Sequence, residues 1–155
     1  MANPRSERSG RARSLSRRLA LQALYQWQMT GQTFSELRNQ FATDEGYPDV
    51  DPEYFQQLLQ GVLESASELD TMLGEWLDRP VAQLDPVEHA VLLIGLQELR
   101  QHPEVPYRVV LNEGVELAKK FGATEGHKFI NAVLDRAARQ LRGAEQAAAP
   151  RAPRG

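Results

Sequence analysis

The stretch DPVEHAVLLIGLQEL, residues 85–99, decides the fold class of this chain. It opens with Asp85 and Pro86, a strong helix start, because aspartate accepts hydrogen bonds from the free amides of the first turn and proline at the first helical position forfeits none. From Val87 to Leu99 apolar residues occupy nearly every side of the helix. A helix that is apolar all round is buried, so the sequence predicts a central helix with other elements packed around it.

Similar start and stop signals recur on both sides of this stretch, and no segment shows the sustained alternation of a half-buried strand. Glycine or proline ends most of the expected helices, and whether residues 52–78 form one helix or two is open. The chain is therefore predicted to be all-α, with about six or seven helices in antiparallel bundles. Further start signals stand at Ser14 or Ser16, at Thr33 with Glu36, at Asp51 with Pro52, and at Thr124.

The composition is that of one globular domain, with 155 residues, 41% of them hydrophobic and 25% charged. There is no cysteine, which excludes disulfides and thiolate metal sites and fits a reducing cytosol. The longest apolar run is far shorter than the roughly 20 residues of a membrane span, and residues 1–10 lack the apolar core of a signal peptide. We expect a cytoplasmic protein with one domain over 14–143, a disordered Arg-rich tail over 1–13 and a disordered Ala/Pro/Arg tail over 144–155.

The net charge of −3 hides a segregated distribution. Residues 1–20 carry six arginines and one glutamate, residues 21–104 carry 15 acidic and three basic side chains, and residues 105–155 carry nine basic and five acidic ones. Such a field could steer an anionic polymer to one surface and a basic protein to another. A solubilising arginine tail is the alternative.

No catalytic motif is present. The glycine-containing segment 122–128 lacks the spacing and the Ser or Thr of a phosphate-binding loop, and the three histidines, His89, His102 and His127, lie on separate elements without metal-ligand spacing. The sequence therefore predicts a binding protein rather than an enzyme, with no metal and no cofactor.

The first helix carries candidate RNA contacts. Arg13, Arg17, Leu21 and Tyr25 recur every fourth residue, so neighbours in this series project from adjacent turns with a drift of about 40° per step. Arginine bridges phosphates, and tyrosine offers a stacking surface to an unpaired base. The alternative is a core-edge Tyr25 with solvated arginines.

A second candidate lies at the start of the last helix. Its free amides present partial positive charge beside Lys128 and Phe129 and could hold an anion. Phe129 could equally be a core residue, by its spacing with Val133.

Four stretches together resemble one known family: residues 23–27 (ALYQW) behind an arginine-rich start, 87–99, 105–122 and 127–135. The chain resembles the NusB transcription antitermination family over roughly residues 11–141. The resemblance implies two packed helical bundles, a lobe over about 14–80 and another over about 81–143. It also implies binding of the boxA segment of ribosomal RNA leader transcripts as single-stranded RNA, in a heterodimer with the ribosomal protein NusE, within a complex that makes RNA polymerase resist termination.

By matching positions, the resemblance implies a candidate contact to the basic partner NusE at Glu88. Departures from the family pattern are Ser14 to Ser16, which interrupt the expected arginine block, and Gly126 and Ala132 in the last helix. One rival is a protein-interaction adaptor without RNA affinity. The other is the NusB-like domain that precedes some RNA methyltransferases. The second is disfavoured because the sequence ends soon after Arg142, which leaves no room for a methyl-donor domain. The RNA-contact candidates implied are Arg13, Arg17, Gln22, Tyr25, Lys128 and Phe129.

Overall fold

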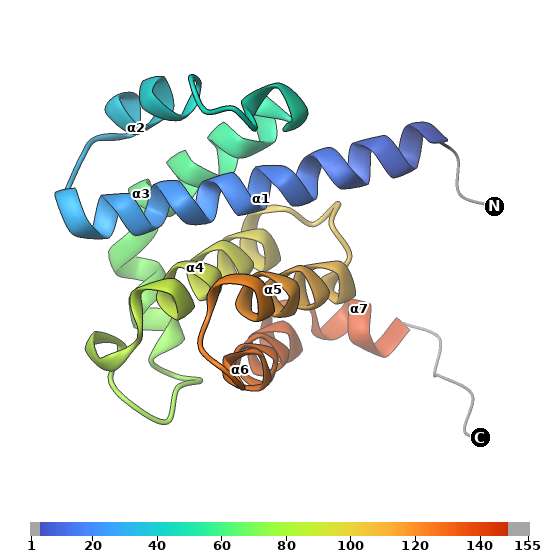
Figure 1. Ribbon diagram of the computed structural model, residues 1–155. Coiled ribbons are helices and arrows are strands. Elements are labelled where there is room, and N and C mark those ends of the chain that lie inside the picture. The colour runs from blue at the N-terminus through green and yellow to red at the C-terminus, as the bar shows by residue number, and fades with distance from the viewer. Residues whose placement is uncertain (1–3, 149–155) are drawn as a thin grey trace.

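A computed structural model describes the protein over residues 4–148 (Figure 1). Its regular secondary structure in that range is helical, with no β-strand. This confirms the predicted all-α class. The seven α-helices are α1 (Pro4–Thr30), α2 (Phe34–Phe41), α3 (Pro52–Leu73), α4 (Pro86–Gln101), α5 (Tyr107–Phe121), α6 (Gly126–Leu141) and α7 (Gly143–Ala148), and two short 3-10 helices cover Tyr47–Asp49 and Val81–Gln83.

Helix α4 is the central helix that its sequence predicts. Asp85 caps it by accepting hydrogen bonds from the amides of Val87 (2.7 Å) and Glu88 (3.2 Å). All ten residues from 90 to 99 are buried, and α4 packs against α1, α3, α5 and α6. Helices α1–α3 form one bundle and α4–α6 the other, with α4 shared at the junction between them (Figure 1).

The predicted caps of α2 and α3 are also present. Thr33 and Glu36 form a reciprocal capping box, and Asp51 accepts from the Tyr54 amide at 3.1 Å. Residues 52–73 are one uninterrupted helix, which settles the question that the sequence left open. Gly61 lies inside this helix where α3 meets α4: a Cβ at this position would lie 2.3 Å from Nε2 of Gln97, so a larger residue would displace the end of that side chain.

The C-terminal bundle is packed around one leucine. A Cβ on Gly95 of α4 would lie 2.7 Å from Leu134 of α6, and a Cβ on Gly114 of α5 would lie 2.8 Å from the same side chain. Leu134 is fully buried. Glycine on both neighbouring helices thus lets α4, α5 and α6 approach closely enough to enclose it.

The N-terminal end of α1 differs from the prediction. The helix begins at Pro4, so Ser14 and Ser16 do not cap it and residues 4–13 are helical where we expected a disordered tail. Ser16 is buried instead, and its hydroxyl donates to the backbone oxygen of Asp51 (2.9 Å) and accepts from the Asp51 amide (2.9 Å). This polar link between α1 and the start of α3 depends on a residue 35 positions away, which local helix signals cannot reveal.

The C-terminal end also extends beyond the prediction, because α7 covers residues 143–148. Arg142 is buried and donates to the backbone oxygens of Leu99, Val105 and His102 at 2.8–3.0 Å. Glu145 pairs with Arg142 and accepts from the Tyr107 amide at 2.9 Å. These bonds hold α7 against the α4–α5 connection. The rest of the two predicted tails, residues 1–3 and 149–155, lies outside the described residues.

Candidate nucleic-acid interface

Tyr25 lies on the surface of α1, with 44% of its area exposed. The alternative of a core-edge tyrosine is therefore not what the structure shows. Gln22 lies one turn earlier, half-buried, and lines a 430 Å³ pocket together with Leu15 and Arg18. Arg18, Gln22 and Tyr25 have the spacing i, i+4, i+7, which places all three on one face of the helix.

Arg17 does not share that face. Its side chain is 3% exposed, and its guanidinium binds the Glu98 carboxylate through Nε (3.0 and 2.9 Å) and Nη2 (2.9 Å). Burial disfavours the charged guanidinium, but the hydrogen bond and charge of Glu98 outweigh it and raise the pKa of Arg17. The geometry is against the RNA contact that the sequence suggested, because both edges of this guanidinium are occupied inside the protein.

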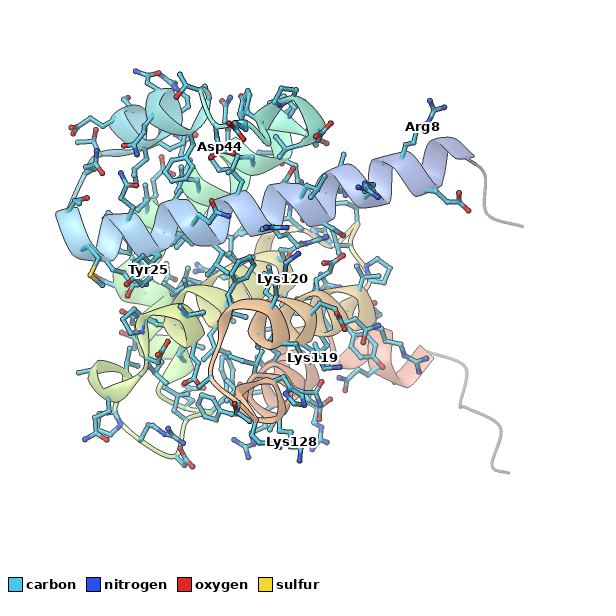
Figure 2. The ribbon with its side chains drawn as sticks, viewed as in Figure 1. Arg8, Tyr25, Asp44, Lys119, Lys120 and Lys128 are labelled. Atoms are coloured by element: carbon cyan, nitrogen blue, oxygen red, sulfur yellow. The ribbon has the colours of Figure 1, made fainter. Side chains whose placement is uncertain are left out.

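Arg13 also turns away from Tyr25. It is half-buried, and its guanidinium carbon lies 4.4 Å from the centre of the Tyr54 ring on α3. A drift of about 40° per step accumulates to about 120° over the three steps from Arg13 to Tyr25. The every-fourth-residue pattern therefore joined residues on different faces, whereas the i, i+7 spacing would have found Arg18. Arg8 projects from the first turns of α1, far from Tyr25 (Figure 2).

The start of α6 differs from the predicted Thr124 cap. Glu125 occupies the cap position with a left-handed backbone (φ 70°) and gives no side-chain cap. The chain enters the helix through a tight turn in which the Gly126 amide donates to the Ala123 oxygen at 3.0 Å. Lys128 pairs with Glu125. Its side chain is still 74% exposed, so its ammonium group is accessible from solvent.

Phe129 is half-buried and packs against the hydrophobic core, and the Arg79 guanidinium carbon lies 4.6 Å from its ring centre. The core alternative for Phe129 thus agrees with its packing, while the ring also reaches the surface. Glu88 of α4 lies next to this turn, because a Cβ on Gly126 would be 3.0 Å from its Oε1. Burial and the charge of Asp85 raise the pKa of Glu88.

A groove lies beside Arg18, between α1 and the end of α5. It has a volume of 360 Å³ and is lined by the cations Arg18, Lys119 and Lys120 together with the carboxylates Glu113 and Glu116. Arg18 also lies over the ring of Phe121, 5.2 Å from its centre. In Figure 2, Lys120 and Lys119 of α5 lie between Tyr25 of α1 and Lys128 of α6. Sequence reasoning missed these lysines, because only the fold places the end of α5 between α1 and α6.

We call the surface formed by Arg18, Gln22, Tyr25, Lys119, Lys120 and Lys128 the basic face. Its cations suit phosphates, and its aromatic ring suits a base. Within the residues that the structure describes, no three metal-ligating side chains gather at one point. None of the helices in this range combines the length and apolar character needed to cross a bilayer.

The fold and the basic face define a class: two-bundle helical proteins with a cationic surface that carries an exposed aromatic ring. The NusB family model matches residues 14–139. The chain belongs to the NusB family.

Relatives from two bacteria illustrate how much of the chain is shared. It is 55% identical to the transcription antitermination protein NusB of Marinomonas sp. over 138 residues, which cover 88% of this chain and 79% of that one. It is 53% identical to the protein of the same name from Hahella chejuensis over 137 residues, 88% of this chain and 92% of that one.

Solved structures agree with the fold. NusB of T. maritima superposes with a TM-score of 0.77 at 24% identity, covering 95% of this chain and 99% of that one. A crystal structure of the antitermination factors NusB and NusE in complex with dsRNA contains a chain that superposes with a TM-score of 0.75 at 25% identity, covering 82% of this chain and 96% of that one.

Proposed function

We propose that this protein is a bacterial transcription antitermination factor that binds boxA RNA of ribosomal RNA leader transcripts together with NusE and helps RNA polymerase resist termination. The observation that carries the proposal is the basic face, where accessible cations flank an exposed tyrosine. Two relatives more than half identical to the chain are named transcription antitermination proteins. A structural relative was crystallised with NusE and RNA.

The basic face divides the work of binding between two kinds of contact. Arg18, Lys120 and Lys128 bind phosphates, which gives affinity without sequence information. Tyr25 stacks on an unpaired base, and Gln22 beside it has an amide that can hydrogen-bond a base edge. Recognition of a particular RNA sequence therefore depends on the α1 end of the face.

Glu88 serves the partner protein in this proposal. It stands in the first turn of α4, and its carboxylate lies beside Gly126 at the start of α6. An acidic side chain there suits a basic ribosomal protein. NusE bound at Glu88 would lie beside the RNA and could complete the specific site.

Binding, without a catalytic step or a cofactor, is sufficient for this role. The protein would act on nascent transcripts, which places it in the bacterial cytoplasm.

The test is to titrate the protein into boxA-containing RNA and into a scrambled RNA of equal length, each with and without NusE. All titrations are made at the same known salt concentration. Single-stranded and duplex forms of both RNAs are compared, because the related complex contained dsRNA. We expect boxA RNA to bind more tightly than scrambled RNA, with the difference largest when NusE is present. Equal affinity for both RNAs under every condition would contradict the proposal, and retained NusE binding alone would identify a protein adaptor.

A further inference from the structure

Arg79 follows α3 in the chain and contacts α6, far from it in sequence. Its guanidinium carbon lies 4.6 Å from the centre of the Phe129 ring. Its Nε donates to Oδ1 of Asp78 at 2.9 Å, and 42% of its side chain is exposed. The guanidinium is thus held between an aromatic ring on its inner side and solvent on its outer side.

We infer that Arg79 is an RNA-contact residue, whose guanidinium, lying over Phe129, is the surface on which an unpaired base stacks. This inference rests on the proposed function. A base that approaches the side of Phe129 covered by Arg79 meets the guanidinium first. Single-stranded RNA bases stack on arginine planes as they do on aromatic rings, so the approaching base adds a third layer to the stack.

The surroundings of Arg79 favour this role. The hydrogen bond to Asp78 and the contact with Phe129 restrict the side chain before RNA arrives, which reduces the entropy lost on binding. Lys128 precedes Phe129 in the chain and is largely exposed, so a phosphate contact is available beside the stacked base. Arg79 and Lys128 then pair a stacking surface with a phosphate contact, as Tyr25 and Arg18 do on α1.

The face of the guanidinium and its charge can be separated by substitution. Arg79→Ala removes both, whereas Arg79→Lys keeps the charge and removes the flat surface. The matched control is Arg139→Ala, which removes another exposed arginine of an ion pair, with Asp135 at 2.8 Å, ten residues beyond Phe129 on α6. Circular dichroism and thermal unfolding establish that each variant folds.

The experiment measures affinity for boxA RNA in the presence of NusE, and the fluorescence of RNAs that carry 2-aminopurine at successive positions. We expect Arg79→Ala to weaken binding about tenfold, Arg79→Lys to weaken it nearly as much, and Arg139→Ala to leave it unchanged. We also expect one 2-aminopurine position to be quenched by the wild type and not by Arg79→Lys.

Three results would overturn the inference. Full affinity of Arg79→Ala would show that the residue makes no contact, tighter binding would show that the guanidinium competes with the base for Phe129, and full rescue by Arg79→Lys would show a phosphate contact only. Absence of boxA preference in the wild-type protein is a separate result, which would contradict the proposed function itself.

Discussion

Arg17 of α1 and Glu98 of α4 form a buried ion pair that joins the two bundles. Both side chains are at most 3% exposed, and three nitrogen–oxygen distances between them lie at 2.9–3.0 Å. Tyr54 of α3 donates its hydroxyl hydrogen to the same carboxylate, and Glu113 of α5 lies 3.3 Å from Arg17. Four helices therefore meet at one polar cluster inside an otherwise apolar junction.

Arg17→Ala leaves the Glu98 charge buried without its cation. Removing one partner of a buried pair typically costs about 3–5 kcal/mol, so we expect the free energy of unfolding to fall by about that amount in urea denaturation. The neighbouring substitution Arg18→Ala is the control. It removes a half-buried arginine of the basic face and should mainly affect RNA binding. We expect the slope of the logarithm of the RNA binding constant against the logarithm of salt concentration to become shallower by about 0.7, the value for one single-strand phosphate contact. Wild-type stability of Arg17→Ala with a reduced salt slope would restore the earlier hypothesis that Arg17 contacts RNA.

The difference between these two arginines shows what local sequence patterns can and cannot predict. Both stand in the arginine-rich start of α1, and periodicity places Arg18 with Tyr25. The partner of Arg17, however, lies 81 residues away in the chain, so its burial follows only from the packing of α1 on α4. The position of Arg79 over Phe129 depends in the same way on two segments 50 residues apart.

Helix α4 represents the opposite case. The sequence predicts both its start at Asp85 and its position as a buried central helix, because the capping side chain and the nearly all-round apolar character act within a few residues. The burial of the polar residues Gln97 and Glu98 is not part of that prediction. The helical start of α1 was not predicted, since the contacts that hold it, such as Ser16 with Asp51, are long-range.

The Tyr54 hydroxyl makes the free energy of unfolding depend on pH in the alkaline range. Burial, then the charge and hydrogen bond of Glu98, raise the pKa of Tyr54 above its ordinary value of 10.0. A group with a raised pKa in the folded state contributes stability below its unfolded pKa, and this contribution is lost as pH rises. We expect the free energy of unfolding to decline above about pH 10, with a steeper decline in the wild type than in Tyr54→Phe. Identical alkaline profiles of the two proteins would show that Tyr54 ionises normally.

Gly95→Ala tests the close packing around Leu134. The added methyl group would lie 2.7 and 3.0 Å from the two Cδ atoms of Leu134, and overpacking of this kind costs about 1–3 kcal/mol. That exceeds the gain of up to about 1 kcal/mol from replacing a helical glycine by alanine. Gly10→Ala is the matched control, because nothing lies within 4 Å of its Cβ, and it should leave stability unchanged or raise it. A stabilised Gly95→Ala protein would mean that Leu134 has room to move.

Tyr25→Ala separates base stacking from charge. Loss of one stacked base costs about 1–3 kcal/mol, so we expect weaker binding of boxA RNA with little change in its salt dependence, and no loss of stability because the ring is 44% exposed. Tyr25→Phe keeps the ring and should keep most of the affinity. Unfolding of Tyr25→Ala in circular dichroism would identify Tyr25 as a core residue after all.

Glu88→Gln tests the partner site, because it keeps the shape of the side chain and removes its charge. We expect weaker NusE binding in calorimetry, and unchanged RNA binding in the absence of NusE. Since burial and Asp85 raise the pKa of Glu88, the wild-type carboxylate takes up its proton at a higher pH than an ordinary glutamate does. Affinity for NusE should therefore decline as pH falls, and this decline should be weaker in Glu88→Gln. Glu64→Gln, an exposed change on α3, controls for charge alone: if it weakened NusE binding as much as Glu88→Gln does, the contact would be a general effect of net charge and not a site at Glu88.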